Sequence, residues 1–181
     1  MAVLKALTSG GKRRELDFYQ TPPEATLALL PLIEHWPSRV WEPCCGDGAI
    51  SKVLEQHGRE VFSSDLVDRG WGMQADFFKL GIQGTSQRTI ITNPPFGRAG
   101  DFIRHAHAIG VERMALLLKV NFWSVKSRMS LFAQWRPYLI APLTWRLDFT
   151  GAGSPHTDCM WCLWDATKNN TETEFEPLAR P

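Results

Sequence analysis

Two short segments of the sequence combine residue types that can hold and activate a ligand. The first is Gly46-Asp47-Gly48, which lies between an apolar segment and the start of a helical pattern. Glycines lack Cβ atoms and let a ligand approach the backbone, and the N–H groups at a helix start are free to bind it. Asp65 follows Gly46 by 19 residues, about the spacing at which a carboxylate receives ribose hydroxyls. Ser51 replaces the third glycine of the dinucleotide fingerprint, so the pattern predicts a ribose-bearing ligand without a diphosphate.

The second segment is Asn93-Pro94-Pro95-Phe96, which directly follows a short apolar run. Two consecutive prolines restrict the backbone and remove two N–H donors. Carbonyl oxygens and the Asn93 amide remain as a rigid set of acceptors beside an aromatic ring. Rigid acceptors suit an exocyclic amino group. Taken alone, each segment is also typical of an ordinary turn or a proline-stiffened strand exit.

The elements around these segments predict an α/β fold. The run Thr21-Pro22-Pro23-Glu24 predicts a helix start with Thr21 as N-cap and Glu24 completing a capping box. Strand, glycine turn, helix and strand then follow as one βαβ unit, which implies a parallel sheet. We expect strands at residues 39–42, 60–64, 89–92 and 114–120, and helices at residues 49–57, 101–109 and 126–135.

Two late apolar segments, residues 143–149 and 159–164, are separated only by a loop at residues 150–158. Successive strands without a crossover helix must pair antiparallel or lie apart. We interpret the loop as a plain connection, with a substrate lid as the alternative.

The length of 181 residues and mass of 20.5 kDa correspond to one ordinary domain. We expect a flexible arm at residues 1–16, a folded domain at residues 17–166 and a frayed polar tail at residues 167–181. No stretch of about 18 apolar residues is present to cross a membrane. Four cysteines are too few for a disulfide scaffold. We therefore expect a soluble, reduced, cytoplasmic protein with no membrane partner.

Basic charge is concentrated in one part of the chain. The net charge is only +1, but residues 98–146 carry eight Lys and Arg against two acidic residues. The same segment holds Phe122, Trp123 and Trp135, a mixture that suits phosphate neutralisation and base stacking. The alternative is a solvated basic face above core aromatics.

The sequence resembles a known enzyme family in four blocks. Glu42-Pro43-Cys44-Cys45-Gly46-Asp47-Gly48, Asp65, Asp76-Phe77-Phe78 and Asn93-Pro94-Pro95-Phe96 occur in the order seen in S-adenosylmethionine-dependent amino-group methyltransferases, in particular the N6-adenine group. The similarity runs from about residue 17 to residue 164 and is greatest to small phage or prophage DNA adenine methyltransferases. It implies a single-domain Rossmann-like fold: a seven-stranded doubly wound sheet, mostly parallel, with an antiparallel last strand.

The resemblance also implies the cofactor, S-adenosylmethionine, and the residues that hold it. Glu42, Pro43 and the backbone of Gly46 and Gly48 would hold the methionine part, and Asp65 the ribose. Asp76 would accept a hydrogen bond from the adenine amino group, with Phe77 against that ring; Asp76 as a simple turn residue is the alternative. The segment that contains Phe18, Tyr19 and Thr21 resembles the N-terminal segment that closes over the cofactor carboxylate in this family. Helix capping by Thr21 competes with that role.

The chemistry explains why the family needs its second motif. An adenine N6 lone pair is delocalised and is a poor nucleophile. Acceptors at the Asn93 side chain and the Pro94 carbonyl, stiffened by Pro95, would bind both amino hydrogens and aim the lone pair at the methyl group. Phe96 would stack on the target base, which must first leave a duplex.

Other residues would bind the nucleic acid around the target base. We expect Phe122 or Trp123 to form the wall opposite Phe96, with core packing as the alternative. The predicted nucleic-acid contacts are Arg98, Lys119, Phe122, Trp123, Lys126 and Arg128.

The sequence therefore predicts methyl transfer to an amino nitrogen of nucleic acid, with adenine N6 in DNA favoured. Adenine in structural RNA, glutamine in protein and a catalytically silent binding module remain as alternatives. Target choice would come from a short, loosely read sequence or from a protein partner that supplies specificity. No metal site is predicted, because Cys159 and Cys162 face opposite sides of a strand and His105 and His107 do not share a helix face.

Overall fold

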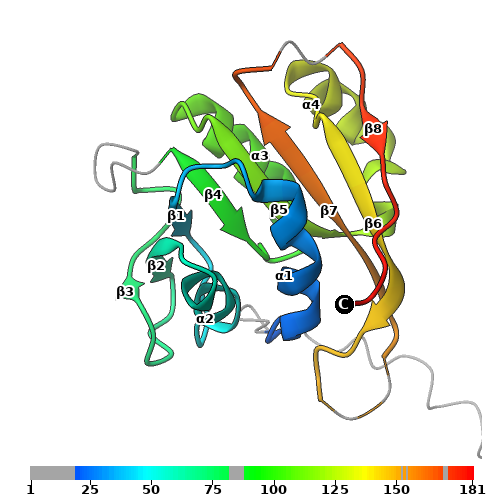
Figure 1. Ribbon diagram of the computed structural model, residues 1–181. Coiled ribbons are helices and arrows are strands. Elements are labelled where there is room, and N and C mark those ends of the chain that lie inside the picture. Colours follow the sequence, from blue (N-terminus) through cyan, green and yellow to red (C-terminus); the bar gives the residue numbers. More distant parts are fainter. Residues whose placement is uncertain (1–18, 82–87, 152, 154, 169–170) are drawn as a thin grey trace, which may run out of the picture.

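The computed structural model describes residues 19–81, 88–151, 153, 155–168 and 171–181. The predicted arm at residues 1–16 and the predicted cofactor contact Phe18 lie outside the described residues. Figure 1 shows a central sheet with helices on both of its faces.

The sheet has eight strands in the order β3-β2-β1-β4-β5-β7-β6-β8. Strand β1 pairs in parallel with β2 on one side and with β4 on the other, and β5 continues the parallel part. Strand β7 is antiparallel to both of its neighbours, β5 and β6. The strands are β1 (Arg39–Glu42), β2 (Glu60–Asp65), β3 (Met73–Gln74), β4 (Thr89–Thr92), β5 (Arg113–Lys119), β6 (Leu139–Leu147), β7 (Thr157–Asp165) and β8 (Glu174–Phe175).

The doubly wound α/β architecture agrees with the sequence, but the count of seven strands is wrong. The additional strand comes from the tail at residues 167–181, which we expected to be frayed. Strand β8 pairs in parallel with β6, and Leu178 bridges to Leu143 with only 9% of its surface exposed. Without the tail, β6 would be an edge strand with unpaired backbone groups. The tail satisfies them and buries one leucine, although its composition is polar.

Two hydrophobic cores lie on opposite faces of the sheet. Helices α1 (Pro23–Leu29) and α2 (Ala49–Gln56) cover one face and pack against residues such as Val40, Ile91 and Trp161. Helices α3 (Ala99–Ala108) and α4 (Met129–Gln134) cover the other, against Ile90, Leu116 and Trp164. In Figure 1, α1 and α2 stand in front of the sheet, and α3 and α4 behind it. Cys159 and Cys162 belong to different cores, so they face opposite sides as predicted.

The first helix starts later than predicted. Pro22 is the N-cap residue of α1 and no side chain in the described part of the chain caps the helix, so the assignment of Thr21 as cap is wrong. The helix tightens into a 3-10 turn, η1 (Leu30–Ile33), where Pro31 has no N–H for an α-helical bond. Thr21 is therefore available for the contact described below.

The predicted helix at residues 126–135 is divided into shorter turns. After β5 the chain forms the 3-10 turns η3 (Val120–Trp123) and η4 (Lys126–Arg128), and then α4. The Arg128 guanidinium donates to the carbonyl of Phe122 at 2.5 Å and lies over the Phe122 ring. These contacts hold the two 3-10 turns together. No described helix is long and apolar enough to cross a membrane.

Candidate functional site

The two sequence motifs meet at the boundary between β1 and β4. Strand β1 ends at Glu42 and leads into the glycine turn, while β4 ends at Thr92 and leads into Asn93. Because β1 and β4 are parallel neighbours, both motifs leave the same edge of the sheet. The chain winds outward in opposite directions from this boundary, and ligands of open α/β sheets bind at such a switch point.

Three consecutive residues before α1 connect the two motifs. Gln20 Nε2 donates to Asp47 Oδ2 in the glycine turn at 2.9 Å, and Asn93 Nδ2 donates to the Thr21 hydroxyl at 3.1 Å. The Tyr19 ring lies 6.3 Å from the ring of Phe96, measured between centroids. We call residues 19–21 the clasp. The sequence placed Tyr19 and Thr21 near the site but did not predict these contacts.

Two buried oxygen atoms in these motifs lack a donor. Among the described residues, no group donates to Asn93 Oδ1 or to Asp47 Oδ1, although both atoms are buried. We call these two atoms the open acceptors. Buried acceptors are normally satisfied, and an unmet one costs about 1–3 kcal/mol. The clasp binds the other terminal atom of each side chain, so each open acceptor is held in a fixed direction.

The glycine turn has a backbone conformation that favours glycine. Gly46 and Gly48 have φ angles of +55° and +82°. A Cβ atom on Gly48 would lie 2.5 Å from the Trp71 ring, so at this position the close approach is made by a protein side chain. Asp65 accepts the N–H of Gly46 at 2.9 Å through Oδ2 and that of Val67 at 2.9 Å through Oδ1. Its carboxylate thus braces the turn.

Glu42 supports the turn from below. It is 1% exposed, and its Oε2 accepts the Ser51 N–H at 2.8 Å together with a very short bond from the Ser51 hydroxyl. Burial raises the pKa of the Glu42 carboxyl well above its ordinary value, although the Ser51 bonds oppose the shift. The Ser51 N–H belongs to the first turn of α2, so Glu42 ties β1 to that helix. Its predicted contact with the methionine part stays a prediction, as does that of its buried neighbour Pro43.

The loop after β3 places Asp76 at a turn and Phe77 in a core. Asp76 Oδ1 accepts the N–H of Phe78 at 3.0 Å, which is the turn role given as the alternative. The Phe77 side chain is 3% exposed and stacks on Phe102 with centroids 4.4 Å apart. Phe77 is thus a core residue. The roles predicted for Asp76 and Phe77 in binding the cofactor adenine remain expectations.

A cavity of about 600 Å³ opens beside the second motif, within the size range of small-molecule sites. Its aromatic wall consists of Tyr19, Phe96 and Phe149, and Lys119 lines it with its ammonium 4.8 Å from the Phe96 ring centre. His156 contributes from the loop between β6 and β7, and Asp158 from the start of β7. This loop and the start of α1 lie at the lower edge of the sheet in Figure 1.

The structure corrects the expected second wall of this cavity. Phe122 is 4% exposed and packs against Trp123 and the Arg128 guanidinium in the core around α3 and α4. Trp123 is half-buried and donates to Cys162 Sγ at 3.5 Å. Both residues come directly after β5 in the sequence, and their rings pack against the sheet. Tyr19 and Phe149 take their place at the cavity.

The remaining predicted nucleic-acid contacts fall into two groups. Lys119 lines the cavity, whereas Lys126 and Arg128 lie on η4. Arg98 precedes α3, where it pairs with Asp101 at 3.1 Å and covers the Phe78 ring. Partial burial and the neighbouring charge of Arg104 lower the pKa of Arg128. A cluster of cations therefore lies where α3 meets η4.

Sequence reasoning missed Asp47, Gln20 and Phe149. The sequence pattern gives Asp47 only the middle position of a turn, and Gln20 stands next to the predicted cap residue Thr21. Phe149 was placed in a strand that ends earlier, at Leu147. The sequence signal for Asp47 is its place between two glycines in the first motif, and the structure holds its side chain there through Gln20.

The strand order and the antiparallel β7 give a fold that is also found in solved S-adenosylmethionine-dependent methyltransferases. No protein-family model and no curated protein sequence matches the chain. Similarity is found among solved structures, and identities of 11–17% mean that it shows the fold alone.

Three of these structures illustrate the range. A Vibrio vulnificus protein assigned as the modification subunit of a type I restriction enzyme has a TM-score of 0.64 at 11% identity; the match covers 88% of this chain and 47% of that one. A Pyrococcus horikoshii protein assigned as an RNA methyltransferase has a TM-score of 0.64 at 17% identity, covering 83% and 87%. The magnesium protoporphyrin IX methyltransferase of Synechocystis, solved with bound S-adenosylmethionine, has a TM-score of 0.50 at 15% identity, covering 79% of each chain. The chain thus spans about half the length of the restriction-enzyme subunit.

Proposed function

We propose that this chain transfers a methyl group from S-adenosylmethionine to an amino nitrogen of nucleic acid, with adenine N6 of DNA as the acceptor. The observation that carries the proposal is the open acceptor Asn93 Oδ1, fixed by Thr21 at the ligand edge of a methyltransferase fold. An acceptor held there without a donor is suited to an amino group that arrives with the substrate.

The residues around the glycine turn fit the cofactor. The α-ammonium group of S-adenosylmethionine could donate a hydrogen bond to the second open acceptor, Asp47 Oδ1, which has no donor among the described residues. Asp65 stands at the end of β2, where a ribose would lie, and keeps acceptor capacity beyond its two backbone bonds. Asp76 lies further along the same edge, after β3. When bound, the cofactor supplies an electrophilic methyl group on a sulfonium.

The chain's own contribution is to orient the amino group. The Asn93 side-chain oxygen and the Pro94 carbonyl accept its two hydrogens, which draws the nitrogen toward tetrahedral geometry and localises its lone pair. Thr21 keeps the Asn93 amide from rotating, and the two prolines keep the carbonyl in place. Phe96 provides an aromatic face for the ring that carries the amino group.

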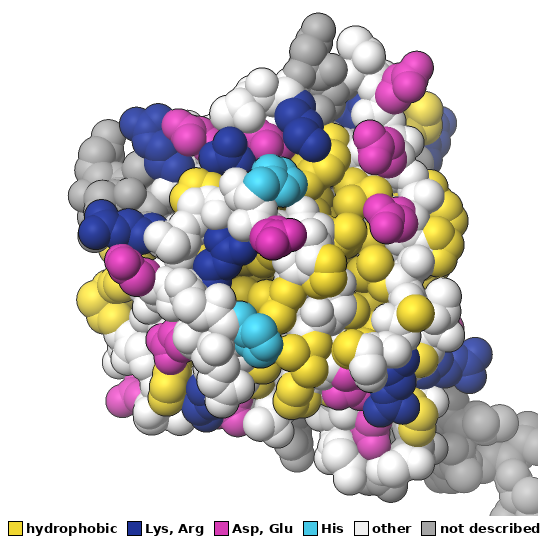
Figure 2. Space-filling view, viewed as in Figure 1, with side chains coloured by type: hydrophobic (Ala, Val, Ile, Leu, Met, Phe, Trp, Pro, Cys, Tyr) yellow, Lys and Arg dark blue, Asp and Glu magenta, His cyan; other side chains and the backbone are white. Residues whose placement is uncertain are grey.

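Charge supports nucleic acid as the substrate. Lys119 at the cavity, and Lys126 and Arg128 on η4, have no ion pair with a carboxylate among the described side chains. On the face that carries α1, Lys and Arg alternate with Asp and Glu around the rim, and hydrophobic side chains gather in the middle (Figure 2). The unbalanced cations therefore mark the cavity and the α3/η4 surface as the places for phosphates.

The test is a methyl-transfer assay with tritiated S-adenosylmethionine against four acceptors: duplex DNA, single-stranded DNA, ribosomal RNA and a protein extract. Nucleic acids are then digested to nucleosides and separated. We expect label in N6-methyl-2′-deoxyadenosine from DNA, and its loss in an Asn93→Ala variant that still binds the cofactor.

Each other outcome assigns a different function. Label in RNA alone would move the acceptor to structural RNA; the Pyrococcus horikoshii protein is assigned as an RNA methyltransferase. Label in glutamine of the extract would make this a protein methyltransferase. No cofactor binding by calorimetry would identify a silent binding module and refute the proposal.

A further inference from the structure

Three aromatic rings surround one point in the cavity. The centroid of Tyr19 lies 6.3 Å from that of Phe96, with 26° between the ring planes. Phe149 lies 5.9 Å from Tyr19 and 6.0 Å from Phe96, and it is steeply inclined to both at 65° and 74°. All three rings line the cavity, and the planes of Tyr19 and Phe96 are within 26° of parallel. We call the space between Tyr19 and Phe96 the ring slot.

A flat ring would fit between Tyr19 and Phe96 after a movement of the Tyr19 side chain. Stacked bases in nucleic acid are spaced by about 3.4 Å, so a base held between two rings requires a separation of about 7 Å. The two centroids lie 6.3 Å apart, so the rings have to move apart or shift sideways to hold a base between them. Tyr19 is 42% exposed, so its side chain has room to make this adjustment.

We propose that Tyr19 and Phe96 clamp the target base between them, with Tyr19 as the second wall of the ring slot. This inference rests on the proposed function and deepens it, because it moves Tyr19 from the cofactor to the acceptor. Tyr19 is a substrate-positioning residue in this assignment, and Phe149 limits how deeply the base enters.

The clasp explains how an exposed residue near the chain start can hold a defined position. Gln20, the next residue, is hydrogen-bonded to Asp47, and Thr21 to Asn93. The two residues that follow Tyr19 are therefore anchored to both motifs of the site, and one of them, Thr21, binds the asparagine that would accept from the amino group of the clamped base.

The slot favours a nucleobase over the amide of a glutamine side chain. An amide has no ring face to fill the gap between Tyr19 and Phe96, whereas base–aromatic stacking is sequence-tolerant and strong. Lys119, 4.8 Å from the Phe96 ring centre, adds a cation at the slot that suits a nucleotide phosphate.

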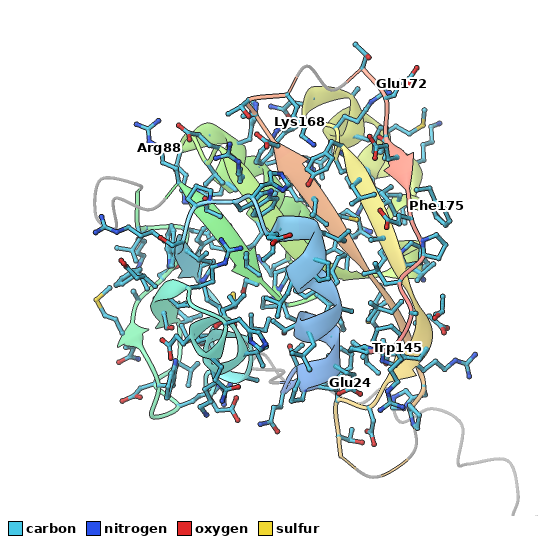
Figure 3. The ribbon with its side chains drawn as sticks, viewed as in Figure 1. Glu24, Arg88, Trp145, Lys168, Glu172 and Phe175 are labelled. Atoms are coloured by element: carbon cyan, nitrogen blue, oxygen red, sulfur yellow. The ribbon has the colours of Figure 1, made fainter. Side chains whose placement is uncertain are left out.

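The test compares two 12-residue oligonucleotides with the same phosphates: one of deoxyadenosine and one of abasic residues. Fluorescence anisotropy gives the dissociation constant of each for the wild type, Tyr19→Ala, Tyr19→Phe and Phe175→Ala. Phe175 is a matched control because it is an exposed ring on β8. In Figure 3 it lies at the right-hand side of the view, well above Glu24 and Trp145.

We expect the wild type to bind the deoxyadenosine strand more tightly than the abasic strand. Tyr19→Ala should weaken binding of the deoxyadenosine strand by roughly 5-fold to 100-fold and leave abasic binding unchanged. Tyr19→Phe and Phe175→Ala should behave like the wild type.

The inference is overturned if Tyr19→Ala weakens both strands equally or neither. Its failure is distinct from that of the proposed function. Methyl transfer to DNA with a Tyr19-independent base preference refutes only the slot, whereas a Tyr19-dependent preference without methyl transfer refutes only the reaction.

Discussion

Asn93 has two functions that its two terminal atoms divide between them. Its Nδ2 holds the clasp through Thr21, while its Oδ1 is an open acceptor. A substitution at Asn93 therefore removes both a structural contact and the acceptor for the amino group. The effects are separable because Thr21 is a different side chain and can be changed alone.

We predict that Asn93→Ala lowers kcat by about 10²- to 10³-fold, the effect of removing one well-placed polar group from a transition state. The dissociation constant for S-adenosylmethionine should change little, because Asp47 and Asp65 remain. Steady-state kinetics and calorimetry give the two values. Thr21→Val, which removes only the tie to the clasp, should lower kcat far less. Equal losses in the two variants would show that Asn93 acts through the clasp alone.

Glu42 gives a prediction about pH and stability. Its pKa is raised by burial, so protonation of this group stabilises the folded state. The contribution is complete below the ordinary value of 4.5 and is lost as the pH rises through the raised value. Glu42→Gln keeps an oxygen to accept from Ser51 and cannot ionise. The free energy of unfolding of the wild type should therefore fall relative to this variant by up to about 1.4 kcal/mol per pH unit within that window.

Urea unfolding between pH 4 and pH 8 measures the difference. Glu55→Gln is the control, because Glu55 is exposed on α2, the same helix that Glu42 contacts. If the free energy of unfolding depended on pH in the same way in Glu42→Gln and Glu55→Gln, burial of Glu42 would not be the cause of the pH dependence.

At the scale of elements, the glycine turn depends on a contact that no local pattern indicates. Gly48 is the N-cap residue of α2 in the left-handed region, and the Trp71 ring lies against it. Lys52 Nζ lies 4.7 Å from the centre of the same ring, so Trp71 packs between the turn and the helix. Helix α2 and strand β2 separate Trp71 from the turn in sequence, and the parallel β1–β2 pairing brings them together.

We predict that Gly48→Ala destabilises the fold by about 2–5 kcal/mol. About 1–2 kcal/mol comes from the positive φ angle and the rest from the clash with Trp71. Gly58→Ala is the matched control: its φ is +81° and a Cβ there would meet nothing within 4 Å, so it should lose only the first part. Chemical denaturation gives both values. Adding Trp71→Ala should restore part of the loss at Gly48 and none at Gly58.

The elements that the sequence predicted well are those fixed by local pattern. Strands β1 and β4 have the predicted bounds, because each is a short apolar run ended by a proline motif. The misassignments arise from distant partners. Thr21 was taken as a cap because its acceptor role depends on Asn93, 72 residues away. The tail was expected to fray because its pairing with β6 depends on an unsatisfied strand edge. Both motifs of the site were visible in the sequence, but the clasp that connects them was not.

At the scale of the whole molecule, the small net charge conceals two groups of cations: one group pairs with acidic side chains and the other does not. Half of the cations in residues 98–146 pair with acids, as in Arg113–Asp165 and Arg146–Asp158. The others lie on or beside aromatic rings or on η4; Arg128 covers Phe122 with 3.9 Å between its guanidinium carbon and the ring centre. A cation that is held in place and lacks a carboxylate partner loses little side-chain entropy when a phosphate binds.

We predict that this α3/η4 surface contacts nucleic-acid phosphates. Lys126→Ala and Arg128→Ala should each reduce the slope of log Kd against log salt concentration by about 1 for a 20-base-pair duplex, since each phosphate contact releases about one counterion. Anisotropy titrations between 50 and 200 mM salt give the slope. Lys126 is exposed, so its removal tests the surface without disturbing the Phe122 packing. Arg39→Ala is the control, because Arg39 is exposed but paired with Glu60 at 3.0 Å on the β1–β2 side of the sheet. Unchanged slopes in both basic variants would place the nucleic acid on another face and leave Lys119 as the cation that meets it at the cavity.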